Sequence, residues 1–116
     1  MTAEAKPVTR LYPFALRARV FVVGKPALRA ARKRLHCVLV TEDLGADARA
    51  AVIEEFGHVP VVAAHHSQDS GDLFGKPGAK IIGILKSTLA RSIYAELRHA
   101  RIHKPPGAAP PQKRST

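Results

Sequence analysis

A run of basic residues in the first third of the chain carries the strongest chemical signal in the sequence. Five of the ten residues at positions 25–34 are cationic: Lys25, Arg29, Arg32, Lys33 and Arg34. Gly24 stands directly before this run, and a glycine turn that opens a helix exposes backbone N–H groups to anions. Because lysine and arginine neutralise phosphates, the pattern predicts a surface for a phosphate-rich polyanion. The alternative is a solvated helix face that keeps a small basic protein in solution.

A second group of residues contains the atoms of a metal site. It comprises three histidines and two aspartates: His58, His65, His66, Asp69 and Asp72. Their spacing fits no zinc motif, and the single cysteine, Cys37, lies in an apolar stretch typical of a buried strand. We therefore expect a polar loop here and no bound metal.

Catalytic and cofactor motifs are weak throughout the chain. Glu42–Asp43 follows an apolar run, where an acid pair would lie at a strand end. No nucleophile or base neighbours this pair in sequence, so we interpret Asp43 as support for the following turn. Gly24 and Gly75 form neither a GxGxxG pattern nor a phosphate loop. The sequence predicts a non-enzymatic protein without a cofactor.

The positive charge is concentrated near the start of the chain. The net charge of the 116 residues is +10. Residues 1–34 contain nine basic residues and one acidic residue, whereas residues 35–103 contain seven basic and eight acidic residues. A basic surface confined to one region favours a polyanionic partner over general solubility. Aromatic residues make up only 5% of the chain, which disfavours a base-stacking platform.

The elements that position these residues alternate between helix and strand. Apolar runs predict strands at residues 20–23, 36–41, 59–64 and 79–85. Helical periodicity and caps predict helices at residues 11–19, 26–34, 45–56 and 87–98. The order predicts an α/β fold, a three-layer α/β/α sandwich with a small mixed four-stranded sheet and the strand at 36–41 in its centre.

The chain length allows one domain. We expect a flexible N-terminus over residues 1–10, a single domain over 11–103, and a disordered, basic, proline-rich tail over 104–116. No apolar run is long enough to cross a bilayer, and the first ten residues lack the apolar core of a secretory signal. We expect a soluble, cytoplasmic monomer with no membrane partner.

Three segments occur in order along the chain: FALRARVFVVG at residues 14–24, LVTEDLGADAR at 39–49 and SGDLFGKPGAKIIGI at 70–84. They resemble segments of the ribosomal protein family known as L-seven-Ae, whose members bind kink-turn RNA. Its superfamily also holds ribosomal proteins L-thirty-e and S-twelve-e. Together the three segments span most of residues 11–97, and their order and separations are similar to those of the family.

The resemblance implies where RNA would bind. In the family, RNA contacts the turn after the first strand, the helix that this turn opens, and the loop before the last strand. The contact residues implied here, together with the neighbouring arginines, are Arg17, Arg19, Gly24, Lys25, Arg29, Arg32, Lys33, Arg34, Lys76, Pro77, Gly78 and Ala79.

The sequence departs from the family at the residues that read the kink-turn. Family members follow the glycine with Asn-Glu and, three residues later, with Lys. The matching residues here are Pro26, Ala27 and Ala30, whose side chains have no hydrogen-bonding groups. The resemblance thus implies RNA binding through phosphates, without base contacts from these three positions.

Two functions follow as hypotheses. The first is a ribosomal or ribosome-associated protein that recognises folded RNA through its basic turn and helix. Kink-turn RNA is one such folded RNA. The second is an adaptor that uses the same fold to bind an acidic protein, which would account for the missing Asn-Glu-Lys residues.

Overall fold

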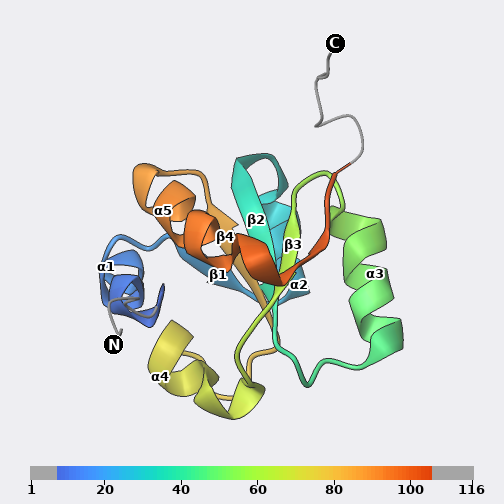
Figure 1. The fold of residues 1–116 in the computed structure, drawn as a ribbon, viewed down its shortest axis with the longest axis horizontal. Coiled ribbons are helices and arrows are strands. Elements are labelled where there is room, and N and C mark those ends of the chain that lie inside the picture. Colours follow the sequence, from blue (N-terminus) through green and yellow to red (C-terminus); the bar gives the residue numbers. More distant parts are fainter. Residues whose placement is uncertain (1–7, 106–116) are drawn as a thin grey trace.

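A five-stranded sheet with helices on both faces forms the domain in the computed structural model, which describes residues 8–105 (Figure 1). The strands are β1 (Phe21–Val23), β2 (Leu35–Val40), β3 (Val61–Ala63), β4 (Ile81–Leu85) and β5 (Arg101–His103). The α-helices are α1 (Tyr12–Arg17), α2 (Lys25–Ala30), α3 (Ala46–Phe56), α4 (Ser70–Phe74) and α5 (Thr88–Leu97). Four 3-10 helices complete the described chain: η1 (Val8–Leu11), η2 (Arg32–Arg34), η3 (Ser67–Asp69) and η4 (Arg98–Ala100).

The sheet is mixed, and its strand order is β1-β4-β2-β3-β5. β2 and β3 are parallel, whereas β4 runs antiparallel to both β1 and β2, and β5 runs antiparallel to β3. β2 occupies the centre, as its apolar sequence predicts, and five of its six residues are buried.

Two cores fill the spaces between the layers. On one face of the sheet, Cys37 and Leu39 pack with Tyr12 of α1, Phe74 of α4 and Ile93 of α5. On the other face, the residues of one apolar core come from β2, β3, α2 and α3 and from the segments that follow β2 and α3: Leu28, Leu35, Val38, Val40, Leu44, Val52, Phe56, Val59 and Val61. The three-layer α/β/α architecture expected from the sequence is therefore confirmed.

The fifth strand is a correction to the predicted four. β5 has only three residues and pairs with the outer edge of β3. Two of the three, Arg101 and Ile102, are exposed, so no buried apolar pattern distinguishes the segment from a loop. Its position is fixed by tertiary contacts, including the 3.0 Å hydrogen bond between Nε2 of His103 and the carbonyl oxygen of Gly57.

The structure describes part of each predicted terminal segment. Val8–Leu11 forms η1, and Val8 packs against the core that includes Tyr12, so order begins before position 11. The proposed flexible segment at residues 1–7 and most of the proposed tail, residues 106–116, lie outside the described residues. Across residues 8–105, none of the helices has the length and apolar character needed to span a membrane.

Candidate functional site

A groove of about 610 Å³ runs beside β1. β1 is an edge strand that pairs only with β4 within the described chain, so its other side is open to a ligand. The lining residues come from α1 and the segment after it, from β1 and α2, and from α4 and the segment after it: Leu16, Arg19, Phe21, Val22, Val23, Ala27, Phe74 and Lys76. The groove is therefore the place where the two predicted contact elements meet, namely the turn into α2 and the loop before β4.

The groove combines an apolar lining with two cations. Arg19 follows α1 and Lys76 follows α4, and both are exposed. No described residue forms an ion pair with either side chain. An anion bound at either side chain would exchange no internal salt bridge for the new contact. The site can accordingly bind a phosphate and an adjoining apolar surface at once.

Aromatic packing holds the lining in place. The ring of Phe21 lies 5.1 Å from that of Phe74, in an edge-to-face arrangement. Buried Tyr12 packs against both, at 5.4 Å from Phe21 and 5.3 Å from Phe74. Such pairs contribute about 0.5–1.5 kcal/mol each beyond their buried area. The groove is thus attached to the core of the protein.

Gly24 forms the turn from β1 into α2. Its backbone has φ +89°, a conformation that favours glycine. Its N–H donates to the carbonyl oxygen of Ile81 at 3.0 Å, and its own carbonyl accepts from Leu28 N–H at 3.0 Å. The turn is therefore attached to the first residue of β4, and Pro26 in the first turn of α2 removes one backbone donor there.

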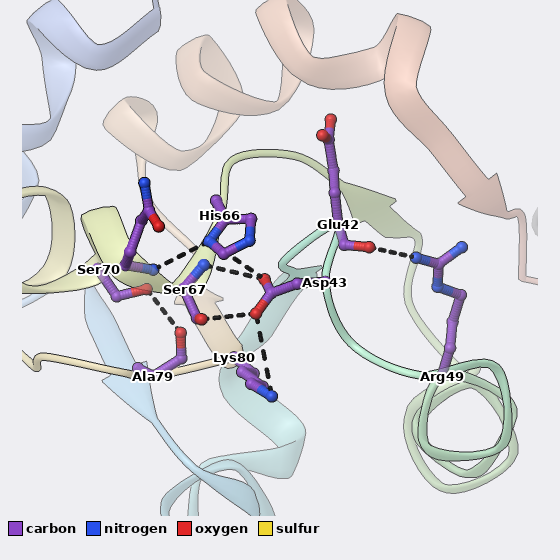
Figure 2. Close-up of polar contacts among 9 residues, drawn as sticks. Glu42, Asp43, Arg49, His66, Ser67, Ser70, Ala79 and Lys80 are labelled. Carbon is purple, nitrogen blue, oxygen red and sulfur yellow. Dashed lines mark hydrogen bonds and ion pairs between the residues drawn. The ribbon is translucent and has the colours of Figure 1, made fainter.

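The loop that carries Lys76, Pro77 and Gly78 is anchored at its end. The buried Ser70 hydroxyl donates to the carbonyl oxygen of Ala79 at 2.6 Å (Figure 2). Gly75 ends α4 in the left-handed conformation, with φ +76°. Lys76, Pro77 and Gly78 themselves are exposed. The loop thus presents its tip to solvent from a fixed base.

Asp43 organises the ends of two strands and the approach to β4. Its carboxylate accepts from Ser67 N–H at 2.9 Å and from the Ser67 hydroxyl at 2.5 Å, and Lys80 Nζ lies 3.9 Å away (Figure 2). The hydrogen bonds from Ser67 hold the pKa of Asp43 well below its usual value. Asp43 therefore binds the first residue of η3 and lies close to Lys80. The sequence predicts only that Asp43 supports the turn into α3.

His66 is also close to Asp43, with Nδ1 4.0 Å from a carboxylate oxygen. That nitrogen accepts a hydrogen bond from Gln68 N–H at 3.2 Å. The His66 side chain therefore caps the start of η3, beside Asp43. Within residues 8–105, no group of three or more His, Cys, Asp or Glu side chains is arranged to hold a metal ion.

Arg29 and Arg32 lie away from the groove. Arg29 forms a bidentate ion pair with Glu55 of α3, and Arg32 donates to the Glu55 carbonyl oxygen at 2.6 Å. The hydrogen bond from Arg29 lowers the pKa of the Glu55 carboxyl group. These two arginines therefore join α2 and η2 to α3, although both remain exposed.

The four remaining predicted cations lie on α1, α2 and η2. Lys25 begins α2, and Arg17 is the last residue of α1, two positions before Arg19. Lys33 and Arg34 lie in η2, next to the first residue of β2. The predicted set is thus divided between the groove, the α2–α3 contact and the beginning of β2.

Sequence reasoning missed the apolar part of the site. Leu16 and Phe21 were assigned to a helix and a strand, and nothing in their spacing marks an edge strand beside a groove. Leu16 is 36% exposed, which is unusual for a leucine beside a core helix face. The two arginines that stand close to Phe21 in RARVF at positions 17–21 are the signal that would have indicated a mixed surface.

The fold resembles that of proteins with solved structures. No protein-family model matches the chain, and a search of curated proteins found no match. A solved protein of unknown function from Bacillus halodurans C is 21% identical, with a TM-score of 0.71 over 81% of this chain and 99% of that one. The Giardia lamblia 15.5 kD RNA-binding protein is 16% identical, with a TM-score of 0.57 over 80% of this chain and 86% of that one. This chain shares its fold with both.

Proposed function

We propose that this protein binds structured RNA at the groove beside β1, and that it acts by binding rather than by catalysis. The observation that carries the proposal is the meeting of Arg19, Lys76 and the apolar lining in one groove. Phosphates supply most of the affinity in RNA recognition, whereas nucleobases offer flat apolar faces. A groove with both kinds of surface fits a bent or looped RNA segment.

The RNA-binding description of the structurally similar Giardia lamblia protein supports the same conclusion. The contact set that we propose is narrower than the set predicted from sequence. It contains Arg17, Arg19, Lys25 and Lys76, with the backbone of Gly24 and of the Lys76–Ala79 loop. Because Glu55 engages Arg29 and Arg32, we expect these two arginines to contribute little.

We further propose that the RNA is ribosomal or ribosome-associated and contains a sharp bend. A bend brings phosphates of one strand close together, which suits cations presented by separate elements. Ala27 lines the groove, so any preference for sheared G·A pairs must come from backbone groups or from shape. A cytoplasmic, ribosome-associated role would follow from this partner.

A titration against two RNAs tests the proposal. One is a short kink-turn RNA, and the other has its sheared G·A pairs replaced, each measured at two salt concentrations. Arg19→Ala and Lys76→Ala should each weaken binding several-fold and lower the slope of log affinity against log salt by about one. Arg98→Ala, which removes an exposed cation from η4, is the matched control and should leave both quantities unchanged.

The outcomes distinguish specific kink-turn binding, binding through phosphates and shape alone, and no RNA binding. A preference for the kink-turn would show that specificity persists despite Pro26, Ala27 and Ala30. Equal, salt-sensitive binding to both RNAs would show that the protein reads phosphates and shape only. Absence of RNA binding by the wild-type protein would refute the proposal.

The apolar lining of the groove also supports the hypothesis of a protein-binding adaptor. Leu16, Phe21 and Phe74 offer an apolar surface, which an extended peptide with acidic flanks would also fit. A fluorescent peptide of alternating leucine and glutamate discriminates the two functions. Binding of this peptide, lost in Arg19→Ala and unaffected by excess RNA, would favour the adaptor.

A further inference from the structure

Three cations stand side by side where three neighbouring strands begin or end. Lys86 follows β4, and its N–H donates to the carbonyl oxygen of Arg34, before β2, at 2.8 Å. On the other side of β4, Leu85 N–H donates to the carbonyl oxygen of Val20 at 2.8 Å, so Arg19 lies beside Lys86. Neighbouring strands are about 4.8 Å apart, so the row of Arg19, Lys86 and Arg34 extends roughly 10 Å. We call this set the strand-end row.

The row lies far from the loop before β4. Lys80 and Lys86 flank β4, and six residues of extended chain separate them by roughly 20 Å. Figure 1 shows the connection from β4 to α5 at the upper edge of the molecule and α4 at the lower edge. The row is therefore a separate surface from the tip of the Lys76–Ala79 loop.

The row has no acidic partner among residues 8–105. No ion pair involves Arg19, Arg34 or Lys86, and all three are exposed. Arg91, in the second turn of α5, adds a fourth exposed cation near the row. The acidic residues Glu54 and Glu55 lie on α3, where Arg29 already binds Glu55.

His36 reports the electrostatic environment of the row. A register shift between Leu35 and Cys37 turns this part of β2, and the His36 ring packs 5.7 Å from that of Tyr94 on α5. Burial and the charges of Arg91 and Lys86 lower the pKa of His36. Two cations that act on one side chain, with no acid to offset them, indicate a positive potential at this end of the sheet.

We propose that the strand-end row is a second RNA contact, which holds the helical segment that flanks the RNA bound in the groove. Arg19 belongs to both surfaces, so a continuous path of cations leads from the groove across the ends of β1, β4 and β2. Consecutive phosphates of one RNA strand follow a helical path, and a row of neighbouring cations can contact them in succession. The inference rests on the proposed function, because the groove must first bind the RNA.

The geometry favours an RNA helix over an acidic protein. The row is built from backbone positions held in register by the sheet, on three neighbouring strands. Such a row suits the regular phosphates of a duplex backbone, whereas acidic protein surfaces carry irregular charges. No apolar side chain is needed, which also fits recognition through phosphates alone.

The test compares two RNAs that share one kink-turn core. The short RNA ends at the core, and the long RNA extends one flanking helix by about ten base pairs. The row variant is Arg34→Ala combined with Lys86→Ala, which removes the two members of the row outside the groove, and the matched control is Arg98→Ala combined with Lys104→Ala, which removes two exposed cations elsewhere. All four side chains are exposed, and thermal unfolding checks that both variants are folded.

We expect wild-type protein to bind the long RNA more tightly than the short one, with a steeper salt dependence. The row variant should bind both RNAs with the affinity that wild type has for the short RNA, and its salt slope on the long RNA should fall by about two. The control variant should keep the preference for the long RNA.

Two results would overturn the inference without affecting the groove. One is an unchanged preference for the long RNA in the row variant while Arg19→Ala and Lys76→Ala still weaken binding. The other is a His36 resonance that responds to polyglutamate and not to RNA, which would assign the row to an acidic protein. A wild-type protein that binds neither RNA would refute the proposed function, and the second contact with it.

Discussion

At the scale of single residues, a few buried polar groups determine the shape of the candidate site. Ser70 is completely buried, and its hydroxyl holds the base of the Lys76–Ala79 loop. His65 takes the left-handed conformation, with φ +69°, and its Nε2 lies 2.8 Å from the Tyr12 hydroxyl behind the groove. Each of these residues links the core to the proposed contact surface.

Ser70→Ala should destabilise the protein by about 0.5–1.5 kcal/mol, because it removes the hydroxyl group that donates to the carbonyl oxygen of Ala79. The measurement is denaturant unfolding monitored by circular dichroism. Ser92→Ala is a suitable control, since Ser92 is exposed on α5 and its hydroxyl contacts only the Thr88 carbonyl oxygen, at 3.3 Å. Equal stability of the two variants would show that the loop needs no such anchor.

Stability should fall as the pH drops below about 6.5. Burial is the main cause that lowers the pKa of both His65 and His36 from the ordinary value of 6.5. The unfolded chain then binds more protons than the folded protein below that pH, so acidification favours unfolding until the folded-state pKa values are reached. Thermal unfolding at pH 7.5, 6.5 and 5.5 measures the effect.

His65→Asn should remove part of this pH dependence, and asparagine tolerates the left-handed backbone. The exposed His99 provides the control variant, His99→Asn, which should keep the full dependence. A wild-type protein equally stable at all three pH values would contradict this prediction.

At the scale of elements, the sequence predicted what local patterns can encode. The apolar run at 36–41 placed the central strand, and Ser87 marked the start of α5, where its hydroxyl accepts from Ala90 N–H at 2.9 Å. α4 and β5 were missed because they are short, and tertiary contacts form them. Likewise, the basic residues were found from sequence, but their division among three surfaces depends on how α2 packs against α3.

Gly83 shows how closely one helix approaches the sheet. It lies in the middle of β4, where a Cβ atom would come within 2.7 Å of Leu35 and 2.8 Å of Val22, and within 3.0 Å of Leu28 on α2. Gly83→Ala should therefore destabilise the protein by about 1–3 kcal/mol through overpacking, as measured by denaturant unfolding. Gly45→Ala is the control, because no atom lies within 4 Å of the added Cβ, and it should unfold like wild type.

At the scale of the whole molecule, the two ends of the sheet differ in charge: one is basic, and the other mixes acidic residues with Lys80 and the loop before β4. Lys86 and Arg34 gather at one end. Glu42 and Asp43 follow β2 at the other, with Asp69 and Asp72 in the segment after β3. Such a distribution orients an approaching polyanion before contact. It also predicts which residues sense the bound partner.

RNA binding across the strand-end row should raise the pKa of His36. Phosphates beside Lys86 and Arg91 would offset the two charges that lower this pKa, while the contribution of burial remains. The measurement is an NMR titration of the histidine ring protons with and without RNA. His58, whose Nε2 lies 3.0 Å from the Arg32 carbonyl oxygen outside the row, serves as the internal reference, and an equal response of both histidines would contradict the prediction.

The buried cysteine has a practical consequence for experiments on this protein. Cys37 is the only cysteine of the chain and is completely buried, and burial raises the pKa of its thiol to about 12. Maleimide dyes react with exposed thiolates, so the native thiol should stay unlabelled in the folded protein. A single introduced cysteine, such as His99→Cys, could then carry a fluorophore without replacement of Cys37. Energy transfer to a labelled RNA would thereby report the orientation of the bound helix on an otherwise unaltered core.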